Sequence, residues 1–330
     1  MSSLKNSWAM LSMAMLVMML LAGCGGRQLV RDDAMQLPSE SQAHAKREVD
    51  ELRRVAAITQ HISTHAVHLC KHRMPRLDFV AHAMPTDGIS NEDAQAVMRY
   101  SKLDADARVV VSWNPQIPVG AKIQRVAERE IKPTIPGWDV QRALTYEGAG
   151  SDAITVVVDG TAHTYSGSDA CAAVVLQRLE RQPKPYNMSY PSERFIISLV
   201  PNQKRELGER SEQELAFLVA LQMAAGAGGK FDSAMSARNV LLATSIIPGV
   251  DLIGKLVGRA WMASRIDWSE IDALAIAMLT ASGYSPSLGV EEFLRRCGSE
   301  CSKAWTEERK KPWMATPKMS ATPLAQSATE

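Results

Sequence analysis

Four histidines recur in the first third of the chain at spacings that would align them on one face of a helix: His61, His65, His68 and His72. Imidazole is a common transition-metal ligand, and two histidines one helical turn apart can hold one ion between them. Imidazoles also titrate near neutral pH, so the cluster could instead sense pH. The structural alternative is that the rings only flank a buried apolar seam, because isoleucine, alanine and leucine recur beside them. We favour this alternative and expect no metal and no other cofactor.

The thiol of Cys24 is a second reactive group, because it follows a short apolar run that closes on Ala22 and Gly23. A single cation, Lys5, precedes the run, which is too short to cross a bilayer and has the proportions of a signal peptide. Small residues before a cysteine suit lipoprotein cleavage, after which the thiol carries a diacylglyceryl group. We therefore expect a lipoprotein signal peptide over residues 1–23 and a lipid anchor, palmitate included, on Cys24. The alternative is an ordinary signal peptide with an incidental cysteine.

The residues after this cysteine predict where the chain resides. Residue 25 is Gly and not Asp. By resemblance to enteric lipoprotein sorting, this favours the periplasmic face of the outer membrane over the inner membrane. Residues 24–45 are polar and lack apolar periodicity, so we expect them to form a tether.

Charge excludes one class of partner. The chain of 330 residues carries 37 Lys and Arg against 36 Asp and Glu. This balance gives no electrostatic basis for binding nucleic acid. The length is sufficient for two modest domains, each with its own core.

The remaining thiols are Cys70, Cys171, Cys297 and Cys301. An even number in an oxidising compartment indicates disulfides, and four cysteines allow three pairings. Cys297 and Cys301 are near enough to bond on one helical face or across a turn. A metal-binding pair is the less favoured interpretation of these two, because no histidine lies nearby. We favour Cys70 with Cys171 and Cys297 with Cys301.

Apolar periodicity in the first half of the chain predicts a long amphipathic helix and then a small α+β module. The helix begins near Ala43, occupies the segment 46–80 and ends near Pro75. The module spans residues 107–168 and holds strands at 109–111, 154–158 and 161–165 with a short helix at 138–146. The pair Asp159-Gly160 between two β-rich runs predicts a hairpin.

The second half of the chain predicts mainly helices, so the fold class is α+β. After a strand at 195–200, Ser211 can cap a buried apolar helix, with Glu214 reaching back to complete a capping box. Further helices are expected at 268–281, which Gly283 terminates, and at 288–296. The apolar stretch 240–262 predicts two packed helices, with a membrane-surface role as the alternative. The composition of residues 310–330 predicts a disordered tail.

Three segments of the second half resemble the core of HtpX-like zinc metallopeptidases, a gluzincin family whose periplasmic members process envelope proteins. The run from Ser211 to Ala225 lies where the family reads E-L-A-x-V-L-A-H-E-x-x-H. The triplet 270–272, Glu-Ile-Asp, lies where it reads E-A-D. Residues 283–286 and 293–296 match its A-G-Y-x-P and W-R-R segments. The resemblance implies a mostly helical peptidase-like domain over residues 172–300.

The segment before this domain resembles a degenerate PDZ module, which some relatives carry ahead of the peptidase core. Residues 119–123, Val-Gly-Ala-Lys-Ile, resemble V-G-D-x-I, and the hairpin at 154–165 resembles the closing strands. Cys70 and Cys171 lie where those relatives have cysteines flanking the module.

The departure from the family pattern decides the expected chemistry. A gluzincin needs two histidines one helical turn apart for zinc and a glutamate between them as general base. Here these places hold Leu221, Gln222 and Ala225. Glu270 occupies the place of the third ligand, but one carboxylate does not make a zinc site, and with Asp272 it could form a buried hydrogen-bonding pair. We therefore expect no zinc and no peptidase activity.

The expected function is that of a non-catalytic pseudopeptidase, an adaptor or scaffold that binds an envelope protein or peptide segment. β-strand addition is the expected mode, at the strand near residues 195–200 or at a PDZ-like groove. The alternative is an active envelope metallopeptidase or metal-binding protein that uses a non-standard site, such as the histidine cluster.

Overall fold

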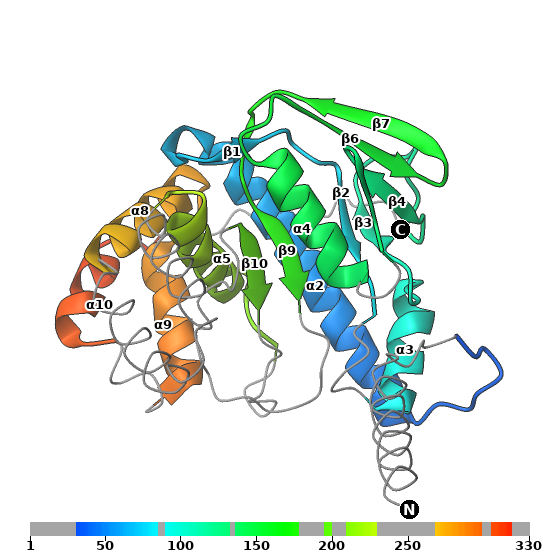
Figure 1. Ribbon diagram of the computed structural model, residues 1–330. Coiled ribbons are helices and arrows are strands. Elements are labelled where there is room, and N and C mark those ends of the chain that lie inside the picture. Colours follow the sequence, from blue (N-terminus) through cyan, green and yellow to red (C-terminus); the bar gives the residue numbers. More distant parts are fainter. Residues whose placement is uncertain are drawn as a thin grey trace, which may run out of the picture.

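The computed structural model describes residues 31–84, 90–132, 136–177, 195–199, 209–229, 268–298 and 305–318. The predicted signal peptide with Cys24, the predicted helices within 240–262, and Cys301 lie outside these ranges. The described chain contains a helical body and a β module, which lie side by side in Figure 1. This mixture of helices and sheets confirms the α+β class.

The central element is α2 (Ser39–His65), which runs diagonally through the molecule in Figure 1. It begins before the predicted Ala43, because Pro38 ends the preceding irregular segment and its carbonyl accepts the first helical hydrogen bond from the N–H of Gln42. The predicted end of this helix near Pro75 is wrong, because α2 ends at His65. A 3-10 turn, η1 (Val67–Leu69), follows the helix, and the chain then enters strand β1 (Arg73–Met74). Pairing of β1 with a distant strand outweighs the helical periodicity there.

The predicted tether is also wrong in part. Its last residues, 39–45, belong to α2. The segment before them lies on helix α3 (Asn91–Ser101), where the backbone N–H of Asp32 donates to the side chain of Gln95 at 2.8 Å. The guanidinium of Arg99 also donates to the carbonyls of Asp32 and Met35. Residues 32–35 are therefore bound to the folded body.

The helical body consists of α2 and α3 with α5 (Glu212–Gly226), α8 (Trp268–Ala281) and α9 (Pro286–Cys297). Helix α5 packs against α2, α8 and α9, and its apolar side chains are buried on all sides, as expected. The predicted cap by Ser211 is confirmed, since its Oγ accepts from the N–H of Glu214, whereas the Glu214 carboxylate, expected to reach back, accepts from Arg296. The predicted end of α8 is confirmed, because Gly283 has φ +75° and the N–H of Tyr284 donates back to the carbonyl of Leu279.

Helix α10 (Glu307–Met314) contradicts the predicted disordered tail over residues 310–318. Trp305 and Trp313 are fully buried, and their rings pack with those of Phe217 and Phe293 at centroid distances of 5.0–6.1 Å. Buried aromatic area of this size outweighs a locally polar composition. The rest of the predicted tail, 319–330, lies outside the described residues.

The β module forms a second core. Strands β2 (Phe79–His82) and β3 (Arg108–Ser112) pair antiparallel, and a four-stranded sheet has the order β5-β4-β6-β7. Its strands are β4 (Ile123–Val126), β5 (Arg129–Glu130), β6 (Ala153–Val158) and β7 (Thr161–Ser166). The predicted hairpin is confirmed, with Asp159 at φ 45° and Gly160 at φ 81° in its turn. Helix α4 (Pro136–Gly148) matches the predicted short helix and packs on β2 and β4.

Two short strand pairs join the module to the body. Strand β8 (Ala170–Cys171) pairs antiparallel with β1, and β9 (Val174–Gln177) pairs parallel with β10 (Ile196–Leu199). Val175 and Ile197 belong to the core of the body, whereas Val174 belongs to that of the module. The β9–β10 pair therefore lies at the boundary between the two cores.

Candidate functional site

The helical turn that would hold zinc in the resembling peptidases lies near the C-terminal end of α5. Leu221 and Ala225 are each 4% exposed and belong to the main core, and Gln222 is half-buried. Neither aliphatic side chain can bind a metal, and an amide does not act as a base near neutral pH. The arrangement on this turn supports packing and offers no catalytic group.

Helices α5 and α8 run antiparallel. The hydroxyl of Tyr284, beyond the end of α8, donates to Glu212 in the first turn of α5 at 3.2 Å. Burial, and then the nearby Glu212 carboxylate, raise the pKa of this hydroxyl. At the opposite end, a side chain at Gly228 would collide with Leu274. The start of α8, with Glu270, therefore lies toward the end of α5 that carries Ala225.

Glu270 and Asp272 do not form the buried acidic pair considered for them. Glu270 is exposed, whereas Asp272 is buried and accepts two hydrogen bonds from Arg309, at 2.7 and 2.9 Å. The Arg309 guanidinium lies between two indole rings, 4.3 Å from the centroid of Trp268 and 4.0 Å from that of Trp305. Asp272 thus anchors α10 to α8 and is not available for catalysis.

The predicted alignment of four histidines on one helical face is wrong, because α2 ends at His65. His68 is exposed in the 3-10 turn, and the ring of His72 lies 5.3 Å from that of Phe195. His61 and His65 do lie together, with ring centroids 4.0 Å apart. In the described ranges, no group of three or more His, Cys, Asp or Glu side chains could hold a metal ion.

Backbone carbonyls occupy one nitrogen of each of these two rings. His61 Nε2 is 2.9 Å from the carbonyl oxygen of Ser282, and His65 Nδ1 is 2.9 Å from that of His61. Burial lowers the pKa of His61, with the Ser282 carbonyl acting in the opposite direction. His61 therefore joins the end of α2 to the end of α8, and its lowered pKa favours the neutral ring, which agrees with the structural interpretation.

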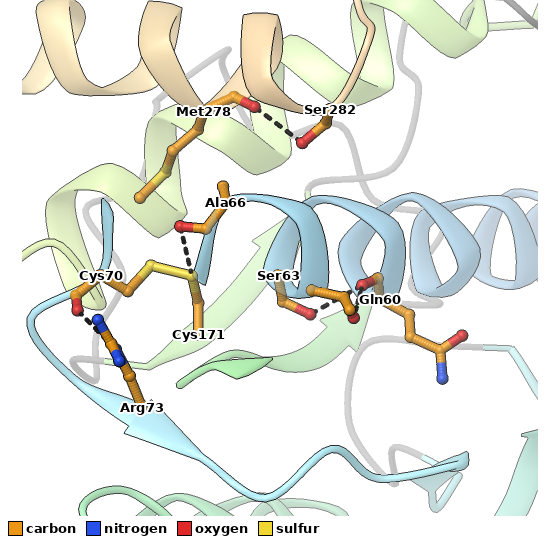
Figure 2. The surroundings of a disulfide bond; sticks show 9 residues. Gln60, Ser63, Ala66, Cys70, Arg73, Cys171, Met278 and Ser282 are labelled. Carbon is orange, nitrogen blue, oxygen red and sulfur yellow. Dashed lines mark hydrogen bonds between the residues drawn. A yellow bond between two sulfur atoms is a disulfide. The ribbon is translucent and has the colours of Figure 1, made fainter. Parts of the chain in front are cut away.

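The predicted disulfide between Cys70 and Cys171 is present, with an S–S distance of 1.96 Å (Figure 2). It ties the end of α2 to β8, and both half-cystines are buried. The carbonyl oxygen of Ala66 lies 3.6 Å from Cys171 Sγ, which is a contact only, because a disulfide sulfur has no proton to donate. Cys297 is also disulfide-bonded, and Cys301, its predicted partner, lies outside the described residues.

The helix of the predicted module, α4, packs on β2, and side chains of the protein itself fill the space between these two elements. Gln141 on α4 is fully buried and donates its amide to the carbonyl of Ala81 on β2 at 2.7 Å. Strand β9 packs against both elements. A cavity of about 60 Å³ remains there, lined by Phe79, Leu144 and Val174 among others, and it is too small for a peptide segment.

The β10 strand offers a more accessible set of backbone groups. The N–H of Val174 donates to the carbonyl of Phe195 at 2.8 Å. In a parallel ladder, this fixes Phe195, Ile197 and Leu199 as the residues that bond to β9. The N–H and C=O groups of Ile196 and Ser198 therefore point to the other edge of β10, where the described residues contain no further strand.

Two contacts described above, that of Arg309 with Asp272 and that of Gln141 with Ala81, were not predicted from the sequence. Arg309 lies in a segment of polar, lysine-rich composition, and Gln141 is one of several polar residues on a short helix. The weak signals available were the two tryptophans beside Arg309 and the apolar neighbours of Gln141 on both sides of the helix.

Comparison of the chain with protein-family models, with curated proteins and with solved structures found no match. None of the helices in the described ranges combines the length and apolar character needed to cross a membrane.

Proposed function

We propose that this protein is a non-catalytic adaptor of the cell envelope that binds an extended segment of another envelope protein by strand addition to β10. The proposal retains the resemblance to HtpX-like peptidases and treats the chain as a member that has lost its zinc. In such a pseudopeptidase, the strand ahead of the former zinc helix still receives a peptide, and no group cleaves it.

The outer edge of β10, which no described strand covers, is the observation that carries the proposal. A parallel pair of two short strands is an incomplete sheet, because parallel sheets normally have more strands and covered faces. Here Val174, Val175, Ile196 and Ile197 are buried, so the pair has the covering that such a sheet needs. An added strand would satisfy the outward N–H and C=O groups of Ile196 and Ser198.

The apolar turn on α5 supports the proposed absence of catalysis. Leu221 and Ala225 are part of the core, so the helix is stabilised at the positions where ligands would weaken its packing.

The proposed location is the periplasmic face of the outer membrane, with acyl chains on Cys24 as the anchor. Because residues 32–35 lie on α3, the segment between the anchor and the body is short. A short tether keeps the body near the membrane and raises its local concentration around membrane-bound partners.

A backbone substitution tests the mode of binding. Ser198→Pro removes an N–H that points away from β9, and Ser198→Ala keeps it. Each variant and the wild-type chain are used to capture proteins from detergent-solubilised envelope. We expect a protein retained by wild type and Ser198→Ala and reduced at least about tenfold by Ser198→Pro. Equal retention by all three would contradict strand addition at β10.

Metal analysis tests the absence of catalysis. We expect the purified protein to contain no stoichiometric zinc and to leave casein intact. One zinc per chain together with chelator-sensitive cleavage would instead establish the alternative, a metallopeptidase with a non-standard site.

A further inference from the structure

We propose that β7 is a self-association edge, through which two copies of this chain pair antiparallel and join their sheets. This surface is separate from β10, so the inference goes beyond the proposed function. It rests on the hydrogen-bonding pattern of the β6–β7 hairpin, on the side chains of β7 and on the partner register that they allow.

The hairpin register fixes which groups of β7 are unpaired. Val158 and Thr161 flank the two-residue turn and form a hydrogen-bonded pair, as such turns require. Bonding then alternates, so Thr161, His163 and Tyr165 bond to β6. The bond from the N–H of Gly167 to the carbonyl of Asp152, 2.8 Å, continues this alternation.

The residues in between direct their N–H and C=O groups to the outside of the sheet. These residues are Ala162, Thr164 and Ser166, and all three are exposed. In the sheet that the structure describes, β7 is the terminal strand, and Figure 1 shows it at the outer rim of the module. Its outer edge is therefore a row of backbone donors and acceptors in contact with solvent.

β7 lacks the usual protection against pairing with another chain. Natural edge strands carry lysine, proline, a bulge or an inward-pointing charge, or are very short. β7 has six residues, contains no Lys, Arg, Asp, Glu or Pro, and pairs with β6 without a bulge. Such an edge is expected to bind another strand.

A second copy of β7 fits this edge. Antiparallel pairing about a two-fold axis at Thr164 places Thr164 opposite its own copy and Ala162 opposite Ser166, so that all outward groups are bonded. It also places His163 opposite Tyr165, an aromatic pair on the inner face, and threonine and aromatic cross-strand pairs are both favourable. Because β7 carries no Lys, Arg, Asp or Glu, no permanent charges on the two strands repel each other.

The strength of this contact is limited by its size. Two six-residue strands bury less than the 1,200 to 2,000 Å² or so of a standard stable interface. The dimer is therefore in exchange with the monomer. Its population depends on concentration, and the light-scattering mass of the full-length protein is expected to rise from one chain toward two over a roughly hundredfold concentration range.

A pair of single cysteine variants tests the register. In Thr164→Cys, the two introduced thiols face each other across the axis, where Cα atoms of such a pair lie about 5.5 Å apart and a disulfide can form. In Ala162→Cys, the two thiols are displaced by four residues, about 14 Å along the strand, which no disulfide spans. Both positions are exposed on the same strand, and the wild-type chain gives the background from its own cysteines.

We expect air oxidation of the full-length protein to give a covalent dimer for Thr164→Cys and only the wild-type background for Ala162→Cys. Thr164→Pro, which removes an outward N–H without affecting the β6 ladder, should keep the mass at one chain. The proposal is overturned by a wild-type protein that stays monomeric at every concentration, by equal cross-linking of the two cysteine variants, or by a folded Thr164→Pro variant that still dimerises. It also fails if a dimer forms and neither cysteine variant cross-links.

Discussion

The Nε atom of Arg296 lies 2.9 Å from each carboxylate oxygen of Glu214, and both side chains are buried. This pair joins α9 to the first turn of α5, and Arg296 also donates to the backbone carbonyl of Glu209 at 3.0 Å. Charged groups removed from water are tolerated when they are paired in this way. The pair therefore fixes the end of α5 that precedes Leu221.

Glu214→Gln is expected to lower the free energy of unfolding by about 3 to 5 kcal/mol, because it leaves a buried guanidinium without its counter-charge. Urea denaturation measures this loss. The matched control is Glu307→Gln, which breaks the ion pair with Lys310 at an exposed carboxylate and should change stability little. Equal effects of the two variants would mean that burial of the Glu214 pair is not decisive.

Arg309→Lys is expected to destabilise the protein by about 1 to 3 kcal/mol although the charge is kept. A lysine loses the bidentate contact with Asp272 and the stacking between Trp268 and Trp305. Denaturation, with proteolysis of the C-terminal segment as a second measure, would detect the release of α10. Lys311→Arg on the same helix should have no such effect. A stable, protease-resistant Arg309→Lys variant would contradict the anchoring role.

Replacement of Cys70 and Cys171 by alanine is expected to cost about 2 to 5 kcal/mol, because a disulfide that closes a long loop restricts the unfolded chain. The two cysteines are 101 residues apart. Thermal and urea denaturation in the absence of reductant measure the loss. An unchanged stability would show that the β1–β8 pairing alone holds this junction.

Asp139 is expected to contribute to acid sensitivity. Burial by itself would raise its pKa, but the N–H of Lys132, at 2.9 Å, and the guanidinium of Arg129 outweigh burial and lower the pKa below its ordinary value of 3.8. The stabilisation is complete above the unfolded pKa and is lost as the pH falls through the folded pKa. Asp139→Asn should therefore show a shallower loss of stability on acidification.

A pH series of denaturation curves checks this prediction. The control is Asp152→Asn in the same module, because Asp152 is exposed and should leave the wild-type slope unchanged. If both variants keep that slope, the ionised form of Asp139 is not preferentially stabilised by the fold.

The resemblance to zinc peptidases predicts that the lost site can be restored. The triple variant Leu221→His, Gln222→Glu, Ala225→His should bind one zinc per chain, and added Glu270→Gln should weaken that binding at least about tenfold. Metal analysis of folded protein measures both. In the control, histidine replaces Ala224 in place of Ala225, so the same groups are present at the wrong spacing. A folded triple variant that retains no more zinc than the control would contradict the resemblance.

Local signals predicted those parts of the fold that local interactions determine. The α8 helix and its glycine terminator, the cap at Ser211 and the Asp159-Gly160 hairpin are each specified by residues a few positions apart. In contrast, the residue at which α2 ends and the helical structure of α10 depend on contacts with residues that are far away in the sequence. Periodicity continues past His65, but pairing of Arg73 with Cys171 bends the chain away.

In the candidate site, too, local features could be predicted from the sequence and long-range contacts could not. The apolar turn on α5 was evident from Leu221, Gln222 and Ala225 in the sequence, because a missing ligand is a local observation. The partner of Asp272 was not, since Arg309 lies in a different segment of unfavourable composition. The hydrogen bond from Gln141 to the carbonyl of Ala81 could not be predicted either, because it depends on how α4 lies on β2.

The position of the β module within the chain has a consequence for folding during synthesis. The module core runs from Met74 to Val174 and is complete before any residue of α5 leaves the ribosome. Its disulfide can form at that stage. The core of the helical body includes Trp313. The apolar stripe of α2 therefore stays uncovered until most of the chain has been synthesised. We expect α2 to be the segment that holdase chaperones bind in this interval, and the one from which aggregation begins when they are absent.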